Sequence, residues 1–241
     1  MLFRSGPRDG LQNEAALVPT AEKVAFIDAL GASGLRVIEV SAFVHPKRVP
    51  QMADAAEVCA AISRRPGVRY TALVPNLAGL DRAAAAGISD IAIFAAASDG
   101  FSRANINQDV DTSLAAYAVV CERARAMGMR IRGYLSTAFG CPFDGPVAPE
   151  RVRAVAERLL DMGVYEVAIS DTIGVAQPGQ VLHVLDTVLG RMPVDRVALH
   201  FHDTRGMGLA NVLAGLTCGV RRSEEHTSEL QSRLHLVCRL L

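Results

Sequence analysis

The chain alternates short apolar stretches with longer amphipathic stretches along most of its length. Six short stretches are rich in β-branched residues, as expected of parallel strands that are buried on both faces. We predict strands at residues 36–40, 69–74, 90–96, 130–136, 166–171 and 196–203. We predict helices between them at residues 21–32, 51–64, 77–86, 109–127, 149–162 and 179–191. Repeated strand–helix units of this kind predict a parallel sheet, either open or closed into a barrel.

Residues at the ends of these elements support the same assignment. Thr20 is placed to cap the first helix, and a proline is tolerated at a helix start. Glycines that can adopt the left-handed conformation separate four helices from the strands that follow: Gly34, Gly87, Gly128 and Gly163.

No G-x-G-x-x-G sequence opens the first helix, which argues against a dinucleotide-binding fold. We therefore predict an α/β fold of the (β/α)8 TIM-barrel type. It is incomplete, with the first strand largely missing before Gly6 and the eighth strand and its helix missing after Gly219.

Composition narrows the class of protein. The 241 residues are 50% hydrophobic, with Lys+Arg 25 balanced by Asp+Glu 25. This balance argues against a nucleic-acid partner or a membrane surface, both of which favour a basic excess. No apolar run reaches the ~18 residues of a membrane span, and the five cysteines include no C-x-x-C pair. We expect a cytoplasmic enzyme without a disulfide or zinc-ribbon framework.

Both ends of the chain depart from the repeating pattern. Residues 222–232 read RSEEHTSELQS, which is the translation of a common sequencing-adapter sequence, and residues 2–5 match the reverse complement of its start. We expect residues 1–5 and 222–241 to be adapter-derived segments that flank an incomplete barrel domain at 6–221, and we expect the tail to pack poorly. A genuine start and a genuine polar tail are the alternative.

The strongest local chemical signal is an H-x-H sequence at the end of the last predicted strand. Side chains two apart on a strand share a face, so His200 and His202 are expected to project together into the barrel mouth. Two imidazoles there form half of a site for a divalent metal, with a polar strand end as the alternative. Asp203 faces the other way and is a candidate cap for the following helix.

Further polar residues are expected at the same mouth. Asp9 in the P-R-D-G loop is a candidate third ligand, and Arg8 can neutralise a carboxylate or a developing enolate. A salt-bridged turn is the alternative, and P-R-D-G by itself is a weak signal. Glu39 lies inside an apolar run, where a carboxylate must be paired or functional, and a salt bridge with Arg8 is the simpler reading. Asp171 ends another strand and is either a site residue or a cap.

Several longer sequences together resemble one known family. They are G-P-R-D-G-L-Q-N-E, S-A-F-V-H-P-K-R-V-P-Q-M-A-D, N-I-N, R-G-Y-L-S-x-A-F-G-C-P-F-D-G, S-D-T-I-G-V and H-F-H-D-T-R-G. From Gly6 to about Arg221, in this order, the chain resembles the 3-hydroxy-3-methylglutaryl-CoA lyase family. That family belongs to a metal-dependent TIM-barrel lyase and synthase superfamily.

The resemblance implies a role for each matched position. It implies metal ligands at Asp9, His200 and His202, usually for Mg²⁺ or Mn²⁺. It implies that Arg8 holds the substrate carbonyl and stabilises the enolate, and that Tyr134 lies near the substrate. It implies that Glu39 and Asp171 support the metal site and proton transfer, with Asp171 or His200 as the base.

The implied reaction cleaves 3-hydroxy-3-methylglutaryl-CoA into acetyl-CoA and acetoacetate, with an acyl-CoA as the small-molecule partner. A homo-oligomer is possible for an intact protein of this family. Ala42 stands where the family often has Ser, and the family's G-G-C-P loop and following Asn ligand are absent, so we expect this chain to show little or no turnover. Two alternatives stay open: a related synthase or aldolase that acts on acetyl-CoA and a keto acid, and an inactive fragment.

Overall fold

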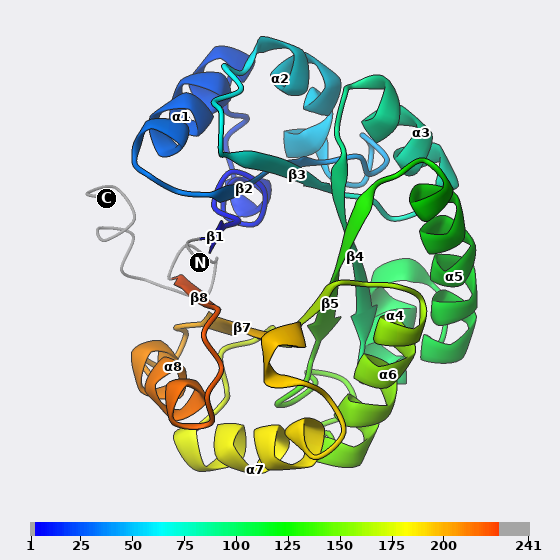
Figure 1. Cartoon of the computed structure of the whole chain (residues 1–241), viewed down its shortest axis with the longest axis vertical. Coiled ribbons are helices and arrows are strands. Elements are labelled where there is room, and N and C mark those ends of the chain that lie inside the picture. Colours follow the sequence, from blue (N-terminus) through cyan, green and yellow to red (C-terminus); the bar gives the residue numbers. More distant parts are fainter. Residues whose placement is uncertain (1–2, 227–241) are drawn as a thin grey trace.

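The computed structural model describes residues 3–226, and it contains one eight-stranded sheet in the order β1 to β8. Every pair of neighbouring strands is parallel, and the strands surround a central axis with helices on the outside (Figure 1). The strands are β1 (Phe3–Arg4), β2 (Val37–Ala42), β3 (Arg69–Leu73), β4 (Asp90–Ala96), β5 (Arg130–Ser136), β6 (Glu166–Asp171), β7 (Val197–His202) and β8 (Ser223–His226). The predicted barrel architecture is confirmed, and each of the six predicted strands is present.

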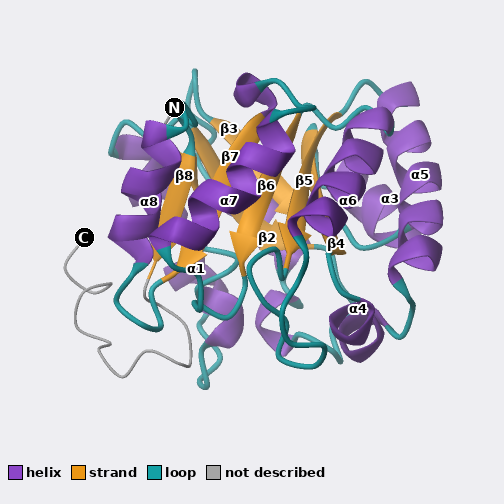
Figure 2. Cartoon of the chain, turned by 90° about the horizontal axis from the view of Figure 1, so that it is seen from below, coloured by secondary structure: helices purple, strands orange, loops and turns teal. Residues whose placement is uncertain are grey.

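The helices follow the strands and cover the outer face of the sheet (Figure 2). They are α1 (Thr20–Ala32), α2 (Ala55–Ala61), α3 (Leu77–Ala85), α4 (Asp99–Ile106), α5 (Val110–Ala126), α6 (Pro149–Asp161), α7 (Pro178–Leu189) and α8 (Gly208–Thr217). Short 3₁₀ helices occur at Leu11–Asn13, Pro50–Met52 and Val194–Arg196. The glycines predicted to follow helices have positive φ angles of 71° to 89°. None of the helices in residues 3–226 is both long and apolar enough to cross a membrane.

Three local expectations differ from the structure. The helix predicted at 51–64 is divided into a 3₁₀ turn and α2, and Asp54 between them accepts hydrogen bonds from Thr20 and Lys23. Thr20 is the first residue of α1 rather than its cap, because its hydroxyl is engaged by Asp54. Helix α4 was not expected, because Ser102 is its only buried residue and its sequence lacks an apolar stripe.

The eighth strand and its helix were expected to be missing; this is wrong for the strand, while no helix follows β8 among residues 3–226. Residues 223–226 form β8, which pairs with β7 from Leu199↔Ser223 to His202↔His226. The physical reason is that β7 would otherwise present a row of unpaired backbone donors and acceptors, which an extended segment satisfies. The pairing of these four residues does not test the expected poor packing of the tail, because its apolar positions fall within residues 227–241, which lie outside the described part. The first strand is reduced to two residues, as expected.

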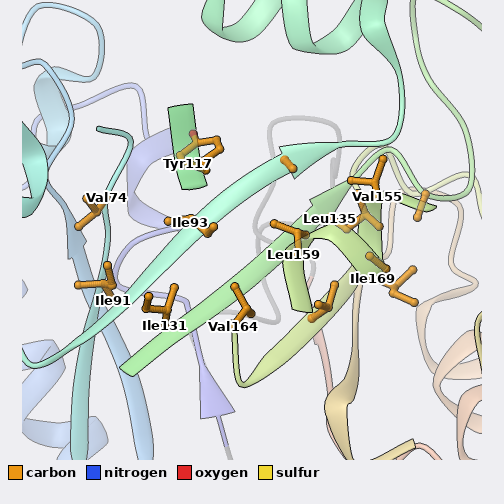
Figure 3. Close-up of a cluster of buried hydrophobic side chains, with 14 of the residues drawn as sticks. Val74, Ile91, Ile93, Tyr117, Ile131, Leu135, Val155, Leu159, Val164 and Ile169 are labelled. Atoms are coloured by element: carbon orange, nitrogen blue, oxygen red, sulfur yellow. The ribbon is translucent and has the colours of Figure 1, made fainter. Parts of the chain in front are cut away.

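Strand periodicity divides the buried side chains into an outer and an inner set. The outer set lies between strands and helices, where Ile91, Ile93, Ile131 and Leu135 meet helical residues such as Leu159 (Figure 3). The inner set is smaller and consists of Ala42, Met52, Leu73, Ala92, Tyr134, Ala168 and Ala198. Small alanines inside the barrel leave room for a cavity at its carboxyl end.

Candidate active site

A cavity of about 440 Å³ opens among the carboxyl ends of the strands and the loops that follow them. This is the end at which enzymes with this fold bind their substrates. Its wall carries both polar and apolar side chains: Arg8, Asp9, Gln12, Asn13, Val44, Arg48, Val49, Pro50, Leu73, Phe94, Phe101, Asn105, Tyr134, Ser136, Ser170, Thr172, His200 and His202. Of the seven predicted site residues, five line the cavity, and Glu39 is hydrogen-bonded to two of these five, Arg8 and Tyr134.

The three predicted metal ligands converge in this cavity. The Nε2 atoms of His200 and His202 lie 3.1 Å apart, and they lie 3.3 and 3.6 Å from Oδ2 of Asp9. One donor atom from each residue lies within 4.8 Å of the other two. The histidines share a face because they are two apart on β7, whereas Asp9 arrives from the loop after β1. Two imidazoles and one carboxylate are a donor set that fits a divalent metal ion.

Arg8 lies beside this group and connects it to Glu39 on β2. Its Nε atom donates to Oε2 of Glu39 at 2.8 Å, and its Nη1 atom donates to Oδ1 of Asp9 at 2.6 Å. The Glu39 side chain is fully buried, and the Arg8 side chain is 8% exposed. The salt bridge expected between Arg8 and Glu39 is therefore present. It leaves Oδ2 of Asp9 directed towards the two imidazoles.

Tyr134 adds a third buried group to the Arg8–Glu39 pair. Its hydroxyl donates to Oε2 of Glu39 at 3.1 Å, and its ring meets the His200 ring edge-on at 6.1 Å. The Arg8 guanidinium lies over the Tyr134 ring at 5.4 Å from its centroid. The structure thus brings Tyr134 into the same cavity wall as the metal-ligand candidates.

Burial and charge set the protonation of these groups. Burial raises the pKa of Glu39, and the Arg8 guanidinium acts against this shift. Burial, together with the Glu39 charge, raises the pKa of the Tyr134 hydroxyl well above its usual value, so the phenol stays protonated and can donate. Burial alone would lower the pKa of Arg8, but Asp9 and Glu39 outweigh it and the pKa is raised. Arg8 therefore remains a cation across the working pH range.

Asp171 is placed differently from the other candidates. It ends β6 and is buried, and its two carboxylate oxygens accept hydrogen bonds from the backbone N–H groups of Val175 and Ala176 at 3.0 and 2.9 Å. Burial raises its pKa and these backbone donors oppose the shift. Asp171 is not one of the described residues that line the cavity. These contacts hold the loop after β6, whereas α7 begins only at Pro178, so Asp171 is not a helix cap and its role in the site stays a prediction. Asp203 accepts a hydrogen bond from the N–H of Gly208, the first residue of α8, while the N-cap position itself is Met207.

Several wall residues were missed by the sequence reasoning. Ser136 follows Tyr134 by two positions and Ser170 precedes Thr172 by two, so the strand period was a usable signal for them. Glu224 on β8 was also missed, and its Oε2 lies 3.3 Å from Nδ1 of His200 while its Oε1 accepts from the N–H of Ser5. A carboxylate behind a histidine ligand is a common way to orient the ring.

Comparison with known proteins identifies the family. The HMGL-like family model matches residues 1–226. The chain belongs to the HMGL-like family. It is 48% identical over 225 residues to the cytoplasmic 3-hydroxy-3-methylglutaryl-CoA lyase of Rattus norvegicus, with 93% of this chain and 66% of that protein covered.

Solved structures of HMGL-like proteins superpose closely on this chain. The HMG-CoA lyase of Brucella melitensis has a TM-score of 0.91 at 45% identity, covering 94% of this chain and 80% of that one. The HMG-CoA lyase of Acinetobacter baumannii, solved with coenzyme A and 3-methylmalate, has a TM-score of 0.89 at 35% identity, covering 93% and 73%. The chain spans about two thirds of the length of the curated rat relative.

Proposed function

We propose that this chain carries the site of a hydroxymethylglutaryl-CoA lyase, which cleaves 3-hydroxy-3-methylglutaryl-CoA to acetyl-CoA and acetoacetate. The observation that carries the proposal is the convergence of Asp9, His200 and His202 beside a buried Arg8 in one cavity. The similarity to lyases of this name supports the same substrate class. The A. baumannii structure with coenzyme A supports an acyl-CoA as the small-molecule partner.

The residues divide the work of the reaction between them. Asp9, His200 and His202 would hold a divalent ion, Mg²⁺ or Mn²⁺, which when bound lowers the pKa of a coordinated hydroxyl group. Arg8 presents a permanent cation to the oxygen that becomes the enolate, and its contacts with Asp9 and Glu39 hold it in place before the reaction. Tyr134 borders the substrate and donates its hydroxyl to Oε2 of Glu39.

The proton acceptor for the tertiary hydroxyl is His200 or Asp171. His200 would bind the ion through Nε2, and its Nδ1 lies 3.3 Å from Oε2 of Glu224, while both oxygens of Asp171 accept backbone hydrogen bonds, so both candidates are kept. A general base must come within hydrogen-bond reach of the proton that it removes.

A synthase or aldolase that acts on acetyl-CoA and a keto acid is the second candidate, because the same metal and arginine would stabilise the same enolate. The two functions differ in the compound consumed. An assay of acetoacetate release from 3-hydroxy-3-methylglutaryl-CoA, with thiol release from acetyl-CoA plus keto acids measured in parallel, separates them.

The assay is run on the 241-residue chain and on a version extended after Val220 by a family-type C-terminal portion. We expect Mg²⁺- or Mn²⁺-dependent acetoacetate release from the extended version and little from the chain as it stands. Condensation without cleavage would favour the synthase, and no reaction of either kind in the extended version would refute the proposal.

Relatives include cytoplasmic and mitochondrial proteins, so a cytoplasmic location, like homo-oligomer formation, stays a prediction.

A further inference from the structure

A buried ion pair lies on the inner face of the barrel, beneath the cavity. Nε of Arg132 on β5 donates to Oε1 of Glu166 on β6 at 2.8 Å, and both side chains are 5% exposed. The two residues are register partners on neighbouring strands. Because side chains on one face of a strand recur every two residues, Arg132, Tyr134 and Ser136 succeed one another on the inner face of β5. Of these three, Tyr134 and Ser136 line the cavity, and Arg132 does not.

Arg132 contacts the site through the Tyr134 ring. Its guanidinium carbon lies 4.7 Å from the ring centroid, closer than the 5.4 Å of Arg8. A guanidinium over an aromatic face is attracted most strongly where water is excluded, and here both partners are buried. The ion pair with Glu166 fixes the guanidinium, so the ring has a fixed support.

The Tyr134 hydroxyl carries this support to the catalytic groups. It donates to Oε2 of Glu39, the same oxygen that accepts from Nε of Arg8. Arg8 in turn donates to Asp9, whose other oxygen faces the two imidazoles. A displaced ring would take one donor away from the buried Glu39 carboxylate, and the Arg8–Glu39 geometry would have to adjust.

We propose that Arg132 is a positioning residue of this site: paired with Glu166 below the cavity, it holds the Tyr134 ring so that Glu39 and Arg8 keep their working arrangement. The proposal rests on the proposed function for its kinetic consequence but not for its structural one. Arg132 touches neither the cavity nor the metal-ligand candidates in the described contacts.

The primary variant is Arg132→Gln, in which Glu166 keeps an ion pair with Arg222. The double variant Arg132→Gln/Glu166→Gln removes both buried charges of the pair. Arg222 loses Glu166 in this variant, but its side chain is partly exposed to water. Arg132→Lys keeps the charge but loses the planar group that covers the ring. Arg130→Gln is the matched control, because Arg130 lies on the same strand, is half exposed and stacks on Tyr165 instead.

The first measurement needs no activity. The 241-residue chain labelled with ¹³C in its four tyrosine rings gives one resonance that Tyr134→Phe identifies. We expect this resonance to shift or broaden in both Arg132→Gln variants and to stay in place in Arg130→Gln. Mn²⁺ binding measured by calorimetry should be unchanged in all of them. An unmoved Tyr134 resonance in a folded Arg132→Gln chain would overturn the proposal, whether or not the protein is a lyase.

The second measurement uses the extended, active form. We expect kcat to fall about 10- to 100-fold in Arg132→Gln with KM nearly unchanged, since small misplacements of catalytic groups cost about this much. Arg132→Lys should recover part of the loss. In a Tyr134→Phe background the further effect of Arg132→Gln should be small, because the hydroxyl link is already gone. Full additivity of the two substitutions would show that Arg132 does not act through Tyr134.

Discussion

Asp9 is the residue on which the proposed metal site depends most. Its Oδ2 atom faces both imidazoles, while its Oδ1 atom is held by Arg8 and by Gln12 at 3.2 Å. A carboxylate held in this way is oriented before the ion arrives. The ion pair with Arg8 also fits a salt-bridged turn, so the direction of Oδ2 towards the two imidazoles is the observation that favours a metal ligand.

Asp9→Ala should weaken Mn²⁺ binding at least about 10- to 100-fold, since even the outer-shell partners of metal ligands contribute this much. Isothermal titration calorimetry on the purified chain measures the effect. His183→Ala is the control, because His183 is an exposed histidine on α7, away from the cavity. Equal Mn²⁺ affinity in Asp9→Ala and the parent chain would place the ion elsewhere.

The buried cysteines Cys59 and Cys121 offer a second test at the scale of single residues. Burial raises the pKa of each thiol to about 11 from an ordinary value of 9.0. The reactive thiolate forms only as the pH rises through the pKa, so at pH 8 the shift alone lowers the thiolate fraction about 100-fold. Iodoacetamide labelling followed by peptide mass spectrometry should leave both largely unmodified while half-buried Cys218 reacts. Rapid modification of Cys59 in the folded chain would contradict the burial of α2 against the sheet.

At the scale of elements, the close packing of α3 against the residues around Phe43 and Pro75 depends on one glycine, Gly79. A Cβ atom added at Gly79 would lie 2.7 Å from the backbone oxygen of Phe43 and 2.9 Å from Cδ of Pro75. Neither neighbour is the end of a flexible side chain, so the helix would have to move. Gly79→Ala should lower the free energy of unfolding by about 1–3 kcal/mol, as measured by urea denaturation.

Gly179 provides the matched comparison, since it also lies in the first turn of a helix, α7, and nothing lies within 4 Å of its added Cβ. Gly179→Ala should be neutral or stabilise the chain by about 0.5–1 kcal/mol, because alanine favours the helix and restricts the unfolded chain. If both substitutions change stability equally, packing at Gly79 is not the cause.

The sequence predicted correctly those elements whose apolar residues recur with a clear strand or helix period. The six β-branched runs became strands, and His200 and His202 could be placed on one face from spacing alone. Helix α4, with the sequence DGFSRANI, was missed because it carries no apolar stripe. Strand β8, with the sequence SEEH, was missed because it carries no apolar alternation. Tertiary contacts determine both elements. The pair of Arg132 and Glu166 was also out of reach, because residues 34 apart become neighbours only through the β5–β6 register.

At the scale of the whole molecule, the two shortest strands, β1 and β8, are the two ends of the sheet, and the strand pairs of residues 3–226 include no ladder between them. Strand β8 pairs with β7 through four residues, and Glu224 on β8 accepts a hydrogen bond from the N–H of Ser5 next to β1. The family model includes these residues, whereas the sequence pattern assigned residues 222–241 to an adapter-derived tail. The origin of residues 1–5 and 222–241 stays a prediction, separate from their structural role.

A chain that ends at Arg221 tests that structural role. It loses β8, which leaves the backbone groups of β7 unpaired and exposes an apolar edge, so we expect a lower Tm and aggregation during size-exclusion chromatography. It also loses the carboxylate of Glu224 beside His200, so Mn²⁺ affinity should fall by up to ~10–100-fold in any monomer that remains. The control ends at His226, keeps β8 and should retain the Tm and the Mn²⁺ affinity of the 241-residue chain. If the chain ending at Arg221 is as stable and binds Mn²⁺ as well as this control, β8 contributes nothing to the stability of the sheet or to the site, and residues 222–226 are dispensable.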